Sequence, residues 1–307
     1  MALNITRKSN SFKVNQKIFI YAVLIPMGVI FLLFWIYPLL NGFYGSLTLW
    51  QGFSTARPFI GFDQYARVFK DATFLKAIGN TFKFAAVFVP LDIILALLIA
   101  MAIENSGKLR TMFRAIYFLP VVTSEIATGL VWAYLYQPSL GLFNQLLRMV
   151  HLPPQSFLLS PEMALYCIIA YSIWKTLGYD MVLFMAGLNA IPNVFHEAAK
   201  VDGASRWQVF WKITLPLLSQ TLVFVLITGM IGTLQIFGPI FVMTSREANA
   251  APGGPLNSTM VVAVYQWQIA FREMNLGYGA AMSVVLFLII MLVTAFQVPL
   301  LRSRWEY

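Results

Sequence analysis

The chain has 307 residues, of which 59% are hydrophobic and only 11% are charged, and its net charge is +9. A soluble domain would be about one-quarter charged, so too little polar surface is available for a water-soluble globule, and lipid must solvate much of the chain. One cysteine, Cys167, excludes an internal disulfide, and two distant histidines do not support a metal site. The scattered basic residues fit the cytoplasmic flanks of membrane helices better than a nucleic-acid surface.

Six stretches are apolar and long enough to span a bilayer, which needs about 20 residues. The sequence therefore predicts an all-α polytopic membrane protein with six transmembrane helices, formed by residues 18–40, 84–103, 115–136, 164–188, 217–243 and 280–301. One transmembrane domain, residues 18–307, follows a basic tail of residues 1–17. The first apolar stretch is too long for a secretory signal and no cleavage site follows it, so we expect both termini in the cytoplasm.

Two of the connecting segments have a recognisable pattern. Residues 66–78 alternate between apolar and charged side chains, which predicts a short helix on the membrane surface. Residues 246–258 are rich in alanine, asparagine, proline and glycine, and we expect them to be mobile.

The segment between the fourth and fifth predicted spans, residues 192–216, predicts a cytoplasmic helix–turn–helix. Pro192 suits the first turn of a helix, and residues 197–200 are strong helix formers. Asp202-Gly203 ends that helix and Ser205 can cap a second one, which leads back to the bilayer. Its alanines allow close approach by another protein, whereas nothing in it suggests a reaction centre.

This segment resembles the EAA loop of ATP-binding-cassette (ABC) importer permeases. The family pattern is Glu-Ala-Ala, a later glycine, and then Ile-x-Leu-Pro. This chain supplies Glu197, Ala198, Ala199, Gly203, Ile213, Leu215 and Pro216 at that spacing. Asp202 and Ala204 also match the carbohydrate subfamily, which includes the maltose and glycerol-phosphate permeases. The resemblance extends over most of the chain, with further matches at Asn80-Thr81, Gly253-Gly254-Pro255, Tyr265 and Gly277-Tyr278.

The resemblance implies a transport subunit without enzymatic activity, located in the inner cell membrane. Such a permease forms half of a pore with a second, unlike permease, and an extracytoplasmic solute-binding protein delivers a sugar or oligosaccharide. Two ATPase subunits each receive one EAA helix. The residues implied in coupling are Glu197, Ala198, Ala199, Asp202, Gly203 and Ala204. ATP and magnesium belong to those partners, since this chain has no phosphate-binding loop and needs no cofactor of its own.

The resemblance also implies a solute path. Tyr179, Gly229, Thr233 and Gln235 align with positions that line the path in the maltose permease, and Glu125 is a further candidate on the third span. Helix–helix packing through glycine and threonine is the alternative interpretation of these residues. Three carboxylates within spans, Asp92, Glu125 and Asp180, favour structural pairing, with Asp180 expected beside Lys175 near the outer mouth.

Three other functions are weaker interpretations of the same sequence. The same kind of importer could carry a non-sugar solute. An ion-coupled secondary transporter would predict inverted repeats, which are not found, and six spans would be few. A membrane enzyme would need a cluster of reactive side chains, which the sequence lacks.

Overall fold

The computed structural model describes residues 19–52, 54, 56–245 and 252–300. Within these ranges every regular element is a helix, apart from an isolated bridge between Thr48 and Phe59. The predicted all-α class is therefore confirmed for this part of the chain. The basic tail and part of the segment expected to be mobile lie outside the described residues.

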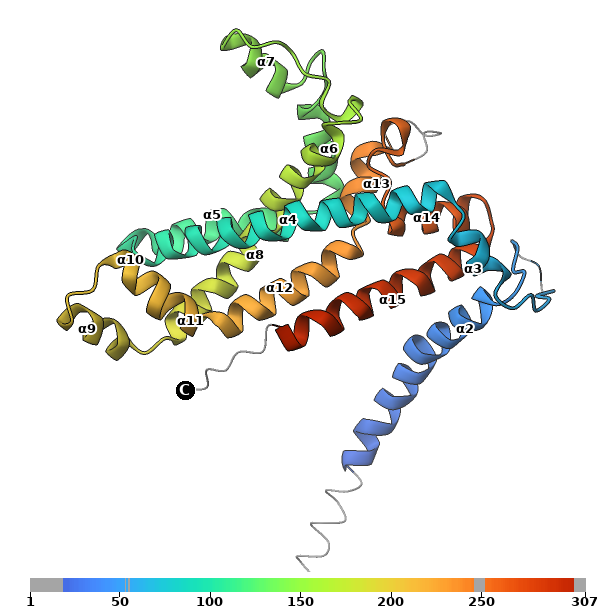
Figure 1. The fold of residues 1–307 in the computed structure, drawn as a ribbon, viewed down its shortest axis with the longest axis horizontal. Coiled ribbons are helices and arrows are strands. Elements are labelled where there is room, and N and C mark those ends of the chain that lie inside the picture. The colour runs from blue at the N-terminus through green and yellow to red at the C-terminus, as the bar shows by residue number, and fades with distance from the viewer. Residues whose placement is uncertain (1–18, 53, 55, 246–251, 301–307) are drawn as a thin grey trace, which may run out of the picture.

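The helices follow one another with short connections (Figure 1). The first helix, Phe19–Ser46, contains the π-helical turn η1 (Leu32–Ile36) and ends as α2 (Tyr37–Ser46). The other α-helices are α3 (Asp63–Val68), α4 (Ala72–Glu104), α5 (Arg110–Val122), α6 (Glu125–Leu135), α7 (Leu142–Met149), α8 (Ala164–Ala190), α9 (Asn193–Val201), α10 (Arg206–Val209), α11 (Leu215–Leu217), α12 (Ser219–Leu234), α13 (Gly238–Thr244), α14 (Val262–Trp267) and α15 (Leu276–Leu300). Shorter 3-10 or π-helical turns are η2 (Gly107–Leu109), η3 (Phe157–Leu159), η4 (Phe210–Thr214), η5 (Pro255–Asn257) and η6 (Gln268–Arg272).

Three of the described helices are long and apolar enough to cross a membrane, namely Phe19–Ser46, α4 and α15. The number rises to five if each of two bent helix pairs counts as one span. Helix α8 has 27 residues but contains Lys175 and Asp180, and it is not among them. The predicted membrane protein is confirmed, whereas the exact number of six spans stays a prediction.

Helices α4 and α8 pack along each other at the centre of the bundle and carry both apolar clusters. One cluster includes Phe84 and Phe88 of α4 with Ile168 of α8, and the other includes Leu97 of α4 with Phe184 of α8. Glycines on α8 bring its neighbours close. A Cβ at Gly178 would lie 2.0 Å from the carbonyl oxygen of Tyr117 on α5, and one at Gly187 would lie 2.4 Å from the hydroxyl of Thr221 on α12.

Two of the predicted spans, residues 115–136 and 217–243, are interrupted. The stretch 115–136 bends by 95° between α5 and α6, where Ser124 has extended backbone and its hydroxyl accepts from the Ala127 amide at 3.5 Å. The stretch 217–243 bends by 65° at Leu218 and breaks again at residues 235–237, before α13. Hydropathy is nearly continuous across these breaks, so the apolar pattern alone does not locate them.

The predicted surface helix at 66–78 is also wrong. Helix α3 ends at Val68, and α4 begins at Ala72 because the carboxylate of Asp71 accepts hydrogen bonds from the amides of Thr73 and Phe74 at 2.8 and 3.1 Å. The residues assigned to the surface helix therefore belong to two elements, and α4 is 33 residues long.

The start of α4 is also the junction with the last third of the chain. The second carboxylate oxygen of Asp71 accepts from the hydroxyls of Tyr265 on α14 and Tyr278 on α15, at 2.7 and 2.9 Å. The Asn80 amide donates to the carbonyl of Met260, and the Thr81 hydroxyl accepts from the amide of Val262. Several residues that match the permease pattern, namely Asn80, Thr81, Tyr265 and Tyr278, therefore form hydrogen bonds between the start of α4 and the last third of the chain.

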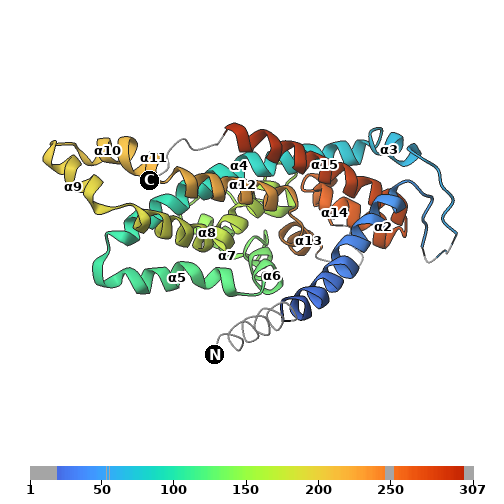
Figure 2. The same cartoon turned by 90° about the horizontal axis from the view of Figure 1, so that it is seen from below.

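The first helix points away from the bundle in Figure 1, and its α2 end is the part that packs on α15, as Figure 2 also shows. None of its most apolar 18-residue window is buried inside the chain. Its end is held where the Ser46 hydroxyl lies 2.6 Å from that of Tyr65 on α3, and where Gly277 donates its amide to the Trp50 carbonyl.

Candidate functional site

The segment that resembles an EAA loop, residues 192–216, projects from one end of the bundle as α9 and α10 (Figure 1), and it is called the EAA loop below because of this resemblance. Helix α9 ends in a Schellman motif, in which the Gly203 amide donates to the Lys200 carbonyl and the Ala204 amide donates to the Ala199 carbonyl. Gly203 has φ +70°, a left-handed conformation that favours glycine. The predicted break at Asp202-Gly203 is thus confirmed, although Pro192 precedes α9 instead of lying in its first turn.

The second helix begins with a reciprocal capping box. The Gln208 amide donates to the Ser205 hydroxyl at 3.3 Å, and the Ser205 amide donates to the Gln208 side-chain oxygen at 2.8 Å. The predicted cap at Ser205 is confirmed. The chain then continues through η4 and α11 into α12, so both ends of the turn are fixed by hydrogen bonds that lie within the loop itself.

Most residues of α9 are exposed, and two of its residues are alanines. Glu197 and Ala198 are exposed, whereas Ala199 is 5% exposed and packs inward. Val201, at the end of the helix, is 88% exposed. A groove of about 400 Å³ lies between α9 and the following turn, and it is lined by Ala198, Asp202, Gly203, Ala204 and Lys212 among others. The six residues implied in coupling therefore lie together on one projecting knob.

The residues implied in the solute path differ in exposure and do not lie together on one surface. Tyr179 on α8 is 51% exposed, and Gly229 on α12 faces open space. Thr233 is 5% exposed, and its hydroxyl donates to the Gly229 carbonyl at 2.6 Å, which is a packing arrangement. Gln235 is exposed at the end of α12, where the helix breaks.

The fifth candidate, Glu125, lies where the two broken spans meet. It begins α6, and its carboxylate lies against Gly238, the first residue of α13, where a Cβ would be 2.6 Å from the nearest carboxylate oxygen. The Lys175 ammonium, on α8, donates to the carbonyls of Pro120 and Thr123 at the end of α5. This pairing satisfies carbonyls freed by the bend and corrects the expectation that Lys175 lies beside Asp180.

The other two intramembrane carboxylates are neighbours of each other. Asp92 on α4 is 2% exposed and accepts from the Thr176 hydroxyl at 3.1 Å. Its carboxyl also lies beside that of Asp180 on α8, close enough for the two acidic groups to interact. Asp180 lies closer to the α9 end of α8 than to its start. The contacts of Asp92 and Asp180 therefore indicate that these residues hold α4 and α8 together and favour the structural interpretation.

A mainly apolar cavity beside Gln235, with a few polar and aromatic side chains in its lining, was missed by the sequence reasoning. It measures about 650 Å³ and lies between the break after α12, the turn α14–η6 and α15. Polar side chains of Gln235, Gln266 and Ser283 line it together with Phe237 and Trp267, and the Ser283 hydroxyl donates to the Gln266 side-chain oxygen at 3.2 Å. The only signal in the sequence is the polar–aromatic run Gln266-Trp267-Gln268 within an apolar region. Among the described residues, no group of three or more His, Cys, Asp or Glu side chains could hold a metal ion.

Comparison with known protein families identifies the family to which this chain belongs. Residues 92–306 match the model of the binding-protein-dependent transport system inner membrane component. The chain belongs to this family. It is therefore a multi-pass permease of the inner membrane, a subunit of an ABC transporter and not an enzyme, as predicted. An ion-coupled secondary transporter is correspondingly not supported.

Relatives of this permease cover nearly the whole chain. The trehalose/maltose transport system permease protein MalF of Thermococcus litoralis is 33% identical over 287 residues, which cover 92% of this chain and 94% of that protein. The sn-glycerol-3-phosphate transport system permease protein UgpA of Rhizobium meliloti is 30% identical and covers 95% of this chain and 97% of its own. The multiple sugar-binding transport system permease protein MsmF of Streptococcus mutans is 31% identical, with coverage of 95% and 98%.

Solved structures share the fold of this permease. A chain in the crystal structure of a bacterial ABC transporter involved in the import of the acidic polysaccharide alginate superposes with a TM-score of 0.83 at 24% identity, covering 96% of this permease and 98% of that chain. The same transporter type was solved in complex with an alginate pentasaccharide-bound periplasmic protein, with a TM-score of 0.81.

Proposed function

We propose that this permease forms half of the translocation pore of a sugar or oligosaccharide importer, together with a second, unlike permease. Two cytoplasmic ATPase subunits bind ATP and magnesium and drive the pore, and an extracytoplasmic solute-binding protein delivers the sugar. Six spans keep both termini in the cytoplasm. The family, the sugar-related names of the three relatives and the alginate transporter of the same fold support this proposal.

The observation that carries the coupling role is the exposed, capped knob of α9. A helix that transmits force to the pore must keep its conformation when an ATPase subunit binds it. Here the Schellman motif and the capping box stabilise both sides of the turn through hydrogen bonds that lie within the loop. Exposed Ala198 leaves room for close approach by an ATPase subunit. ATP-driven closure of the ATPases then moves α9 and shifts the pore between outward and inward access.

Cysteine cross-linking tests this role directly. Cys167 is the only cysteine, so Cys167→Ala provides a background in which Ala198→Cys is the one reactive thiol. We expect the cysteine at position 198 to cross-link to the ATPase subunit in the assembled importer, and to react with a membrane-impermeant maleimide only from the cytoplasmic side.

The matched control is Ala127→Cys, because Ala127 is an exposed alanine on α6, outside the EAA loop. Cross-linking at neither position, or equally at both, would disprove the docking of α9. Labelling of position 198 from outside the cell would disprove the proposed orientation.

We propose that the sugar passes the cavity beside Gln235. Tyr179, Gly229 and Glu125 belong to the same path, whereas Thr233 shapes it through packing. Aromatic faces and amide or hydroxyl groups together suit a sugar, whose rings are apolar on their faces and polar at their edges. The cavity combines Trp267 and Phe237 with the amides of Gln235 and Gln266.

Transport assays with proteoliposomes test this path, using trehalose, maltose and sn-glycerol 3-phosphate as probes. We expect Trp267→Ala and Gln235→Ala to raise the KM for the transported compound by about tenfold, the size expected when one aromatic or hydrogen-bonding contact is lost. Trp35→Ala, on the exposed first helix, is the control. Unchanged transport in both cavity variants would contradict the path.

A further inference from the structure

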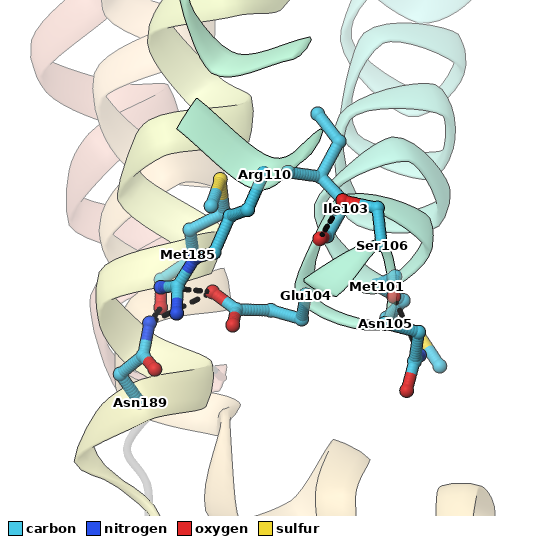
Figure 3. A network of polar contacts seen from close by, with 8 residues as sticks. All are labelled: Met101, Ile103, Glu104, Asn105, Ser106, Arg110, Met185 and Asn189. Atoms are coloured by element: carbon cyan, nitrogen blue, oxygen red, sulfur yellow. Dashed lines mark hydrogen bonds and ion pairs between the residues drawn. The ribbon is translucent and has the colours of Figure 1, made fainter. Parts of the chain in front are cut away.

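Three helix ends are joined beside the EAA loop by one carboxylate. Glu104 is the last residue of α4, and the same oxygen of its side chain accepts from the Arg110 guanidinium at 2.7 Å and from the Asn189 amide at 2.8 Å (Figure 3). Arg110 is the first residue of α5, and Asn189 precedes the last residue of α8. The amide of Asn189 also donates to the Met185 carbonyl, one turn earlier in α8.

The connection from this junction to α9 is short and stiff. Only Ala190, Ile191 and Pro192 separate Asn189 from the first residue of α9. Ile191 is 6% exposed, and the proline ring fixes one backbone angle. The loop and the junction also face a common cleft of about 1140 Å³, which Glu104 and Asn189 line from one side and His196, Lys200 and Arg206 line from the other.

We propose that Glu104, with Arg110 and Asn189, is a positioning site that makes the ends of α4, α5 and α8 carry α9 as one rigid body. This rests on the proposed docking of α9 to an ATPase. The Glu104 side chain is 19% exposed, so a carboxylate there is poorly solvated and gains from two donors. Its removal leaves Arg110 and Asn189 without their shared acceptor, and each helix end can then shift separately.

The test measures distance in the assembled importer, without any sugar. Spin labels are placed at Val194 on α9 and Met112 on α5, both exposed, in the Cys167→Ala background. Pulsed electron paramagnetic resonance then records the distance distribution with and without MgATP. We expect a narrow distribution that MgATP does not change, and a distribution at least about twofold wider in Glu104→Ala and Asn189→Leu. Glu104→Gln retains an oxygen acceptor and is expected to lie between the two.

Asn105→Ala is the matched control. Asn105 is the next residue in the chain, but its amide donates to the Met101 carbonyl of its own helix and joins no second helix (Figure 3). The site would be disproved if Glu104→Ala kept the narrow distribution, or if Asn105→Ala widened it equally.

A second readout separates this site from a merely structural role. ATP hydrolysis by the assembled importer is measured with and without its solute-binding protein, and thermal unfolding is measured in parallel. A structural role alone lowers the unfolding temperature and leaves stimulation intact, whereas loss of positioning reduces the stimulation by about fivefold or more. Failure of position 198 to cross-link in the unmodified junction would instead disprove the docking on which this inference rests.

Discussion

Gly203 is the residue on which the shape of the EAA loop depends most directly. Its φ of +70° places it in the left-handed region, and its amide closes the end of α9 on the Lys200 carbonyl. No atom lies within 4 Å of the Cβ that another residue would add, so space is available and only the backbone conformation restricts this position. The glycine of the permease motif is thus explained by the left-handed backbone conformation at position 203.

We expect Gly203→Ala to loosen the end of α9, because an L-residue in this conformation costs about 1–2 kcal/mol. Hydrogen–deuterium exchange of the α9 amides should become about tenfold faster, which corresponds to about 1.4 kcal/mol. Gly232→Ala, at an open position inside α12, should leave that exchange unchanged. Equal effects of the two substitutions would show that backbone strain is not the cause.

Asp71 combines a helix cap with a joint between distant segments. Burial alone would raise the pKa of this carboxyl, but hydrogen bonds from Tyr265, Tyr278 and the amides of Phe74 and Thr73 together lower the pKa below its ordinary value of 3.8. A group whose pKa is lower in the folded state contributes stability above its unfolded pKa, and this contribution is lost as the pH falls through the folded pKa.

The prediction concerns Asp71→Asn. At neutral pH we expect a loss of about 1–2 kcal/mol, because the two tyrosine hydroxyls lose a charged acceptor. Between pH 7 and pH 3 the unfolding temperature of the unmodified chain should fall more steeply below pH 4 than that of the variant. Asp63→Asn, at an exposed carboxylate that begins α3, serves as the control. Parallel pH curves for Asp71→Asn and the unmodified chain would contradict this account.

At the scale of elements, the sequence predicts the helix ends that are fixed by nearby residues. The helix breaks that depend on distant residues are not predictable in this way. The ends of α9 and the start of α10 are predictable from Asp202-Gly203 and Ser205, because their hydrogen bonds lie within the same few residues. The central helices α4 and α8 are predictable from their long apolar runs, although the early start of α4 depends on the cap at Asp71.

The breaks in the third and fifth predicted spans are of the opposite kind. The bend before α6 is stabilised by Lys175, which lies more than 50 residues away in sequence, and α13 begins where Glu125 of another helix lies against Gly238. Neither partnership has a local signal. For the same reason the cavity beside Gln235 was missed, since Gln266 and Ser283 meet it only through the packing of α14 and α15.

We expect Lys175→Met to destabilise the bend between α5 and α6. The substitution keeps most of the apolar side chain but removes the donor to the Pro120 and Thr123 carbonyls. The Pro120 carbonyl still accepts from the amide and hydroxyl of Thr123, so the expected cost of about 1–3 kcal/mol comes mainly from the Thr123 carbonyl, which loses the lysine donor. Thermal unfolding of the purified permease measures this loss. Lys83→Met is the control. Lys83 is an exposed residue of α4 whose ammonium lies over the ring of Tyr166 on α8, away from the bend between α5 and α6. Equal losses would indicate a general effect of charge.

At the scale of the whole molecule, the two broken spans end in one packed unit. Helices α6 and α13 pack against each other, and Gly129 allows the contact, since a Cβ there would lie 3.4 Å from the Cβ of Val242. Figure 1 shows both helices at one side of the bundle, away from α9. We therefore expect α6 and α13 to move as one unit if the proposed motion of the EAA loop reaches this side of the bundle.

A disulfide tests whether this unit moves as a whole. The Cβ separation at Gly129 and Val242 is close to the range of about 3.5–4.5 Å that a disulfide needs. We expect Gly129→Cys with Val242→Cys, in the Cys167→Ala background, to oxidise readily and to retain ATP-driven transport. Transport that stops on oxidation and returns on reduction would show that the two helices must separate during the cycle.

The isolation of the first helix has a consequence for biosynthesis. Because none of the most apolar 18-residue window of this helix is buried against the bundle, its entry into lipid gains hydrophobic free energy without help from the helices that follow it. This helix leaves the ribosome before α4, so it can anchor the growing polypeptide at the bilayer while the less apolar α8 still lacks the α5 carbonyls to which Lys175 donates.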